Sequence, residues 1–199
     1  MTQSLDLKEL ERRAWMLCCS EDGLFDIFIG LMMLTVGVRT LTDNVWYTLG
    51  MGVALVVHLG GKKLISTPRI GRVRFGPIRK VRQRIVMAVV VMSVVATLAL
   101  LTLTLLMGAP SRGVMAPLIG IWFAVFFGLI AHYMDFGRLY AYGVLFAISL
   151  ALTEAYDNAL GPIASAVSGG IVLLIGLVVF IRFLGKYRMP GEEALDVTA

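Results

Sequence analysis

Six apolar stretches dominate the chain, and each approaches the roughly 17 to 25 residues that an α-helix needs to cross a bilayer. The predicted spans are residues 24–41, 45–61, 85–107, 117–134, 139–156 and 163–184. Of the 199 residues, 58% are hydrophobic and 16% are charged, whereas about a quarter of a soluble domain is charged. The sequence therefore predicts an all-α fold, a polytopic integral membrane protein with six transmembrane helices.

The six spans leave few residues for a separate soluble module, which excludes a nucleotide-binding or catalytic globular domain. We expect residues 1–23 to lie on the cytoplasmic side and residues 24–184 to form the transmembrane domain. Residues 185–199 are then a short cytoplasmic tail. The only long connection is residues 62–84, because the other spans are joined by short turns.

The segment before the first span has the pattern of an amphipathic helix. Over residues 4–20, Leu7, Leu10 and Leu17 share one face, and charged residues occupy the others. We predict an N-terminal interfacial helix that lies on the bilayer. It lacks the order of a signal peptide, so we expect it to remain in the mature protein. The adjacent cysteines, Cys18 and Cys19, provide neither a disulfide framework nor a four-ligand zinc site.

Positive charge is distributed unequally between the two sides of the predicted bundle. With the N-terminus in the cytoplasm, 16 of the 18 Lys and Arg residues fall on the cytoplasmic side. Only Arg39 and Arg112 fall on the outer side. Because cytoplasmic loops of membrane proteins are enriched in Lys and Arg, both termini are predicted to be cytoplasmic.

The connection at residues 62–84 carries nine positive charges and no acidic residue. Its basic residues are Lys62, Lys63, Arg69, Arg72, Arg74, Arg79, Lys80, Arg82 and Arg84. We predict that they contact anionic lipid headgroups. An acidic protein partner or a phosphorylated ligand is the alternative, because arginine binds phosphate through two hydrogen bonds. Pro68 and Pro77 are expected to prevent a continuous helix, with a short extended or hairpin element at 72–75.

Two segments carry a resemblance to a known group of proteins. They are Ser-Thr-Pro-Arg-Ile-Gly-Arg-Val-Arg-Phe at 66–75 and Asp-Gly-Leu-Phe-Asp-Ile at 22–27. Together they resemble segments of small uncharacterised bacterial integral membrane proteins with a Pro-Arg-Ile-Gly-x-Val-x-Phe juxtamembrane motif. The resemblance covers about a tenth of the chain. It implies a bacterial inner-membrane location and no particular activity.

Two histidines end stripes of small residues spaced four apart, which places each stripe on one helical face. The stripes are Gly50, Ala54, His58 and Gly120, Ala124, Gly128, His132. Small residues let helices approach closely, so both histidines are expected to point into the bundle. Asp26 and Asp135 fall in the same inner layer of the membrane. We therefore predict an inner polar site of Asp26, His58, His132 and Asp135.

Three interpretations of this site remain open at the level of sequence. It is a structural hydrogen-bonded cluster, a proton or ion pathway, or a pair of ligands for a metal or for haem b. Haem would be held non-covalently by His58 and His132, because the chain has no Cys-x-x-Cys-His motif. No resident cofactor is predicted.

Arg39 and Glu154 lie near the outer ends of the first and fifth predicted spans. They are predicted to form an ion pair between helix ends, with an outer gate as the alternative.

The sequence contains no motif of a zinc hydrolase, a serine hydrolase or an intramembrane aspartyl protease, so we expect no enzyme. The first functional hypothesis is a small transporter or channel-type protein for an ion or small solute, with a homo-oligomer or a membrane complex as the candidate assembly. The alternative is a non-catalytic membrane scaffold or subunit that docks a partner or anionic lipids through the basic loop. A second alternative is a bis-histidine haem-binding electron carrier. Nucleic acid is not an expected partner.

Overall fold

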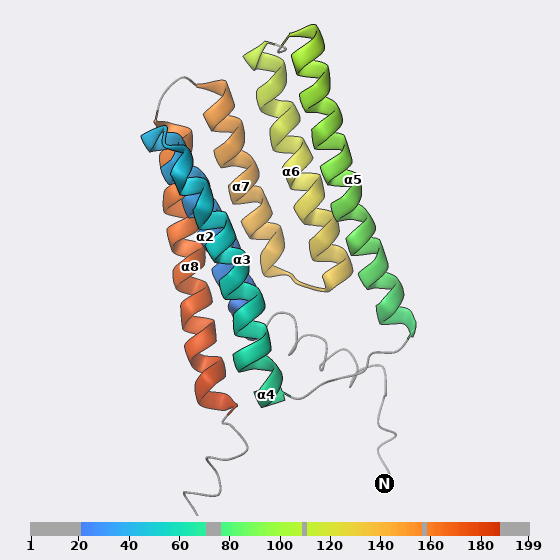
Figure 1. Cartoon of the computed structure of the whole chain (residues 1–199), viewed down its shortest axis with the longest axis vertical. Coiled ribbons are helices and arrows are strands. Elements are labelled where there is room, and N and C mark those ends of the chain that lie inside the picture. Colours follow the sequence, from blue (N-terminus) through green and yellow to red (C-terminus); the bar gives the residue numbers. More distant parts are fainter. Residues whose placement is uncertain (1–20, 71–76, 109–110, 157–158, 188–199) are drawn as a thin grey trace, which may run out of the picture.

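The computed structural model describes residues 21–70, 77–108, 111–156 and 159–187, and all regular structure among them is helical (Figure 1). The helices are α2 (Leu24–Thr42), α3 (Leu49–Gly61), α4 (Thr67–Ile70), α5 (Pro77–Met107), α6 (Arg112–Met134), α7 (Arg138–Ala155) and α8 (Leu160–Lys186). Two short elements, η1 (Val45–Thr48) and η2 (Lys62–Ser66), flank α3. The predicted all-α class is confirmed for this part of the chain. The predicted interfacial helix at 4–20 and the predicted extended element at 72–75 lie outside the described residues.

Within the described residues, five helical segments are long and apolar enough to cross a membrane. They are Leu24–Thr42, Val45–Arg69, Lys80–Leu106, Gly113–Met134 and Leu160–Lys186. Helix α7 does not belong to this set, but it packs against both α6 and α8. The protein is therefore an all-helical bundle of membrane-protein character.

Consecutive long helices run in alternating directions, so that residues 21 and 187 lie at the same end of the bundle (Figure 1). We call this end the basic end, because most of the described Lys and Arg residues lie there. Its basic residues are Lys62, Lys63, Arg69, Lys80, Arg82, Arg84, Arg138, Arg182 and Lys186. The end of α2 that carries Arg39 lies at the opposite end.

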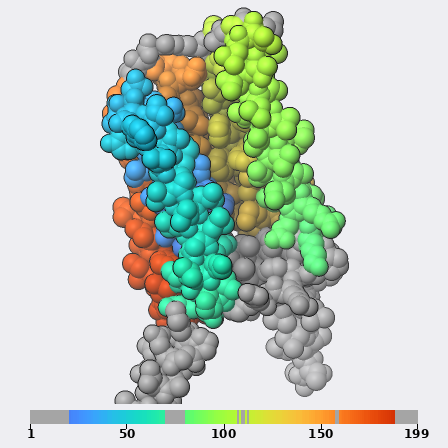
Figure 2. All heavy atoms as spheres, in the orientation of Figure 1, coloured from blue at the N-terminus to red at the C-terminus, as the bar shows by residue number. Residues whose placement is uncertain are grey.

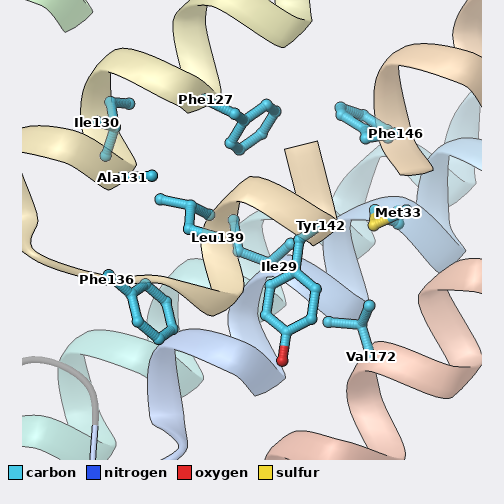
Figure 3. Close-up of a cluster of buried hydrophobic side chains, with 10 residues drawn as sticks. All are labelled: Ile29, Met33, Phe127, Ile130, Ala131, Phe136, Leu139, Tyr142, Phe146 and Val172. Carbon is cyan, nitrogen blue, oxygen red and sulfur yellow. The ribbon is translucent and has the colours of Figure 1, made fainter. Parts of the chain in front are cut away.

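The buried core lies between α2, α6, α7 and α8 (Figure 3). It consists of Ile29, Met33, Phe127, Ile130, Ala131, Phe136, Leu139, Tyr142, Phe146 and Val172. Phe127 of α6 meets Phe146 of α7 edge to face, with 5.8 Å between ring centroids. Aromatic pairs favour this geometry, and it fixes how α6 and α7 sit against each other.

Helices α2 and α8 form the most extensive helix pair, and glycines allow their backbones to touch. The glycines at this contact are the N-cap Gly23 with Gly30 and Gly37 of α2, and Gly169 and Gly176 of α8. A methyl group added to Gly176 would lie 2.6 Å from the backbone nitrogen of Ile27. The seven-residue spacing keeps each glycine set on one helical face. Close backbone approach of this kind is a common way to associate transmembrane helices.

The expected break at Pro68 is wrong, because α3 continues through the π-helix η2 into α4. Proline lacks an N–H group, and its ring clashes with the carbonyl four residues earlier in an α-helix. The wider π turn relieves this conflict, and the Thr67 hydroxyl donates a hydrogen bond to the Lys62 carbonyl at 2.7 Å. Pro77 instead begins α5, where a missing N–H group breaks no helical hydrogen bond.

Helices α3 and α5 are mostly exposed within the single chain. Ala54 is the one buried residue of α3, and the apolar span of α5 contains no buried residue among those described. The surface is hollowed between these two helices (Figure 2). Their apolar faces are suited to contact with lipid.

Candidate functional site

A buried ion pair links α2 to α7 at the basic end. Asp26 lies in the first turn of α2, and its side chain is 1% exposed. Its Oδ2 atom lies 2.8 Å from Nη1 of Arg138, the first residue of α7. The Arg138 side chain is 37% exposed, and its guanidinium lies over the Phe136 ring. The carboxylate is therefore enclosed by protein, whereas the guanidinium also reaches the surface.

Tyr142 completes this cluster one helical turn after Arg138. Its ring belongs to the core, and its hydroxyl interacts electrostatically with the Asp26 carboxylate (Figure 3). Among the described residues, the Tyr142 hydroxyl and Asp26 Oδ1 are buried polar atoms without a hydrogen-bond partner, whereas Asp26 Oδ2 is held by Arg138. Buried polar atoms of this kind are uncommon in proteins. The cluster therefore retains hydrogen-bonding capacity for a proton, a water molecule or a small solute.

A second polar layer holds the start of α2 in place. Asp22 is fully buried, and one of its carboxylate oxygens accepts a hydrogen bond from the Ser66 hydroxyl at 3.0 Å. Its other oxygen lies 3.3 Å from the backbone N–H of Leu24. His58 is half-buried, and its Nδ1 lies 3.4 Å from the Leu24 carbonyl. These contacts fix α2 against α3 and η2.

The structure brings Asp26 and His58 to the same end of α2, and the other two predicted inner-site residues lie in the last turn and at the C-cap of α6. Asp135 forms an ion pair with Arg82 of α5 at 2.7 Å. His132 is exposed on α6, so the expectation that it points into the bundle is wrong. Steps of four residues drift by about 40° each on an α-helix. Over the three steps from Gly120, this drift carries His132 away from the packed face.

The structure also locates the residues of the predicted outer pair and of the predicted metal or haem site. Arg39 is exposed and Glu154 is half-buried, and no ion pair joins them within the described part of the chain. Across residues 21–70, 77–108, 111–156 and 159–187, no group of three or more His, Cys, Asp or Glu side chains is arranged to hold a metal. His58 packs between Phe25 and Phe28, on a different helix from His132.

Arg69 and Arg82 of the predicted basic loop make contacts inside the protein. Arg69 donates hydrogen bonds from Nη1 to the carbonyls of Leu184 and Tyr187, at 3.0 and 2.6 Å. Arg82 makes the ion pair with Asp135. These two residues therefore have a role in holding helices together. Arg72 and Arg74 lie outside the described residues, and the lipid contact predicted for the basic loop stays a prediction.

Reasoning from the sequence missed Arg138 and Tyr142 as site residues. A usable signal was present, because Arg138 opens a span and Tyr142 follows it by four residues on the same face. No protein-family model, curated protein or solved structure matches the chain.

Proposed function

We propose that the protein moves an ion or small solute across the membrane, with Asp26, Arg138 and Tyr142 as its inner polar site. The observation that supports this is the Asp26 carboxylate, which is buried in the bundle beside Arg138. Ionisable groups are expensive to bury within a membrane, and they commonly mark proton and ion pathways. Asp26 Oδ1 and the Tyr142 hydroxyl are buried without a hydrogen-bond partner among the described residues, and they offer sites for transient binding.

The proton is the ion that this cluster suits best. Backbone contact between α2 and α8 leaves little width between these two helices, which disfavours a broad pore there. A carboxylate accepts and releases a proton, and arginine remains positively charged throughout. Asp26 would carry the proton, Arg138 would stabilise the carboxylate after release, and the Tyr142 hydroxyl would help to pass the proton on.

Proton flux into proteoliposomes tests this proposal. Vesicles containing the full chain and a trapped pH-sensitive dye are given a potassium gradient, and valinomycin then creates a membrane potential that drives proton entry. We expect the wild-type protein to acidify the vesicles faster than protein-free vesicles. Asp26→Asn should reduce the rate to near that of protein-free vesicles, because asparagine cannot carry the proton.

Asp43→Asn is the matched control. Asp43 is exposed at the other end of α2, and its left-handed backbone conformation also suits asparagine. This variant should retain the wild-type flux. The proposal fails if wild-type vesicles behave like protein-free vesicles, or if Asp26→Asn leaves the flux unchanged.

We also propose that α7 is a sixth span and that both termini face the cytoplasm of a bacterial inner membrane. Helix α7 has 18 residues, a length of about 27 Å at 1.5 Å per residue. It lies in the bundle between α6 and α8, and residues such as Leu139 and Phe146 belong to the buried core (Figure 1). The concentration of Lys and Arg at the basic end supports the orientation.

The alternative proposal, a membrane scaffold that binds anionic lipids or a partner through its basic end, has one specific observation in its favour. The exposed Lys63, Lys80 and Arg84 lie at this end together with Arg182 and Lys186. A scaffold would need these charges and would not need the Asp26 carboxylate. Normal proton flux in Asp26→Asn, with partner or lipid binding lost on neutralising the basic end, would favour it over transport.

A further inference from the structure

A pocket of about 270 Å³ opens at the basic end, between the start of α7 and the end of α8. It is lined by Glu21, Arg138, Val179, Arg182, Phe183, Lys186 and Tyr187. The five residues from 179 to 187 recur at intervals of three and four, which places them on one face of α8 and its C-cap. A single helical face and the first residue of α7 therefore form most of the pocket.

The pocket lining has an excess of positive charge. Three cationic side chains, those of Arg138, Arg182 and Lys186, face one carboxylate, that of Glu21. Arg182 makes no ion pair in the part of the chain that the structure describes, and it is exposed. The Lys186 ammonium lies 5.3 Å from the centre of the Tyr187 ring. Arg138 forms the ion pair with Asp26.

The pocket also has an apolar wall that leads toward the lipid-facing surface. Val179 and the buried Phe183 line it. One turn before Val179 on α8, Ile175 is exposed. A ligand with a charged head and an apolar tail would thus meet cations at the end of the bundle and apolar side chains along the helix.

We propose that this pocket binds an anionic phosphate group, as carried by a lipid headgroup or by free phosphate. Arginine and lysine are the side chains that bind phosphate oxygens most strongly, and their charge-assisted hydrogen bonds exceed neutral ones in strength. The apolar wall favours the lipid as the source. This site does not depend on the proposed transport activity, because binding requires only the side chains of the pocket.

Lipid-induced stabilisation of the detergent-purified full chain tests the proposal. The protein is titrated separately with phosphatidylglycerol, phosphatidylcholine and inorganic phosphate, and the thermal unfolding midpoint is recorded. Phosphatidylcholine is the lipid control, because its choline group neutralises the charge of the phosphate. We expect phosphatidylglycerol to raise the midpoint and phosphatidylcholine to raise it far less. An equal rise with inorganic phosphate would identify free phosphate as a sufficient ligand.

Three variants locate the binding. Arg182→Gln with Lys186→Gln should weaken the apparent affinity by about tenfold or more, since each charge-assisted hydrogen bond is worth roughly that factor. Both side chains are exposed, so the unliganded protein should keep its unfolding midpoint. Glu21→Gln should strengthen binding, because it removes the one negative charge of the lining.

The double variant Lys80→Gln with Arg84→Gln is the matched control, because it also removes two positive charges. Both residues are exposed on α5 at the same end of the bundle. The pocket predicts a much smaller loss of affinity for this pair. Equal losses for the two pairs would show diffuse attraction to the basic end and would overturn the proposal. It is also overturned if neither phosphatidylglycerol nor inorganic phosphate stabilises the wild-type protein.

Discussion

The Asp26–Arg138 ion pair is asymmetric, because the carboxylate is 1% exposed and the guanidinium side chain is 37% exposed. Arg138→Gln leaves a buried carboxylate without its partner, which typically costs about 3 to 5 kcal/mol. Asp26→Asn leaves a cation that can turn to the surface, so we expect a smaller loss. Denaturant unfolding in detergent measures the free energy of unfolding of each variant. Equal losses would contradict the asymmetry.

Arg69 shows how one side chain anchors the helix beyond Pro68. Its two hydrogen bonds satisfy carbonyls at the end of α8, which have no partners within that helix. Arg69→Ala should destabilise the protein by about 1 to 3 kcal/mol, whereas Lys63→Ala, an exposed neighbour in η2, should have little effect. A thermal unfolding comparison of the two variants measures the difference. Similar midpoints would show that the hydrogen bonds contribute little.

At the residue scale, the sequence identifies ionisable side chains that lie within or next to apolar spans. It does not show which of these side chains contact one another. Asp26 was identified because a charge at the start of a span is conspicuous. In the sequence, Arg138 only adds to the cytoplasmic excess of Lys and Arg, because its partner lies more than 100 residues away along the chain. His132 was misplaced because a four-residue stripe was extended over three steps without allowing for helical drift.

At the element scale, the two adjacent glycines of α8 offer a direct test of the α2–α8 contact. A methyl group on Gly169 would meet the backbone of Leu34 and Gly30, and one on Gly170 would meet nothing within 4 Å. Gly169→Ala should therefore destabilise the bundle, because the two backbones must move apart. Gly170→Ala should be neutral or stabilising by up to about 1 kcal/mol, because alanine favours the helix. Unfolding midpoints that shift in the same direction and by the same amount would contradict the proposed contact.

The helices themselves were largely predictable, because apolar runs of membrane length leave little ambiguity. The predicted spans 24–41 and 163–184 correspond to α2 and α8 within a few residues. The helix across residues 62–70 was not predictable from Pro68 alone, because it depends on a π turn and on the Arg69 contacts with α8. The seven-residue glycine spacing was visible in the sequence, but its significance emerges only when α2 and α8 are seen in contact.

At the scale of the whole molecule, the two ends of α2 lie at opposite ends of the bundle, and the proposed orientation places them on opposite sides of the membrane. Single cysteines at Thr42 and Gly185, in a background with Cys18 and Cys19 replaced by serine, report the orientation. An impermeant maleimide added to spheroplasts should label Thr42→Cys directly. It should label Gly185→Cys only after the membrane is permeabilised. The reverse pattern would contradict the proposed cytoplasmic basic end.

The central claim is that the buried Asp26–Arg138 pair acts in transport and does more than hold α2 against α7. Proton flux through the double variant Asp26→Asn with Arg138→Gln tests it most directly. Removing both charges leaves no unpaired buried ion, so the fold should be retained, as its unfolding midpoint will show. We predict a stable protein whose proteoliposomes acidify no faster than protein-free vesicles. A stable double variant with wild-type flux would show that the pair is structural and would contradict the proposed function.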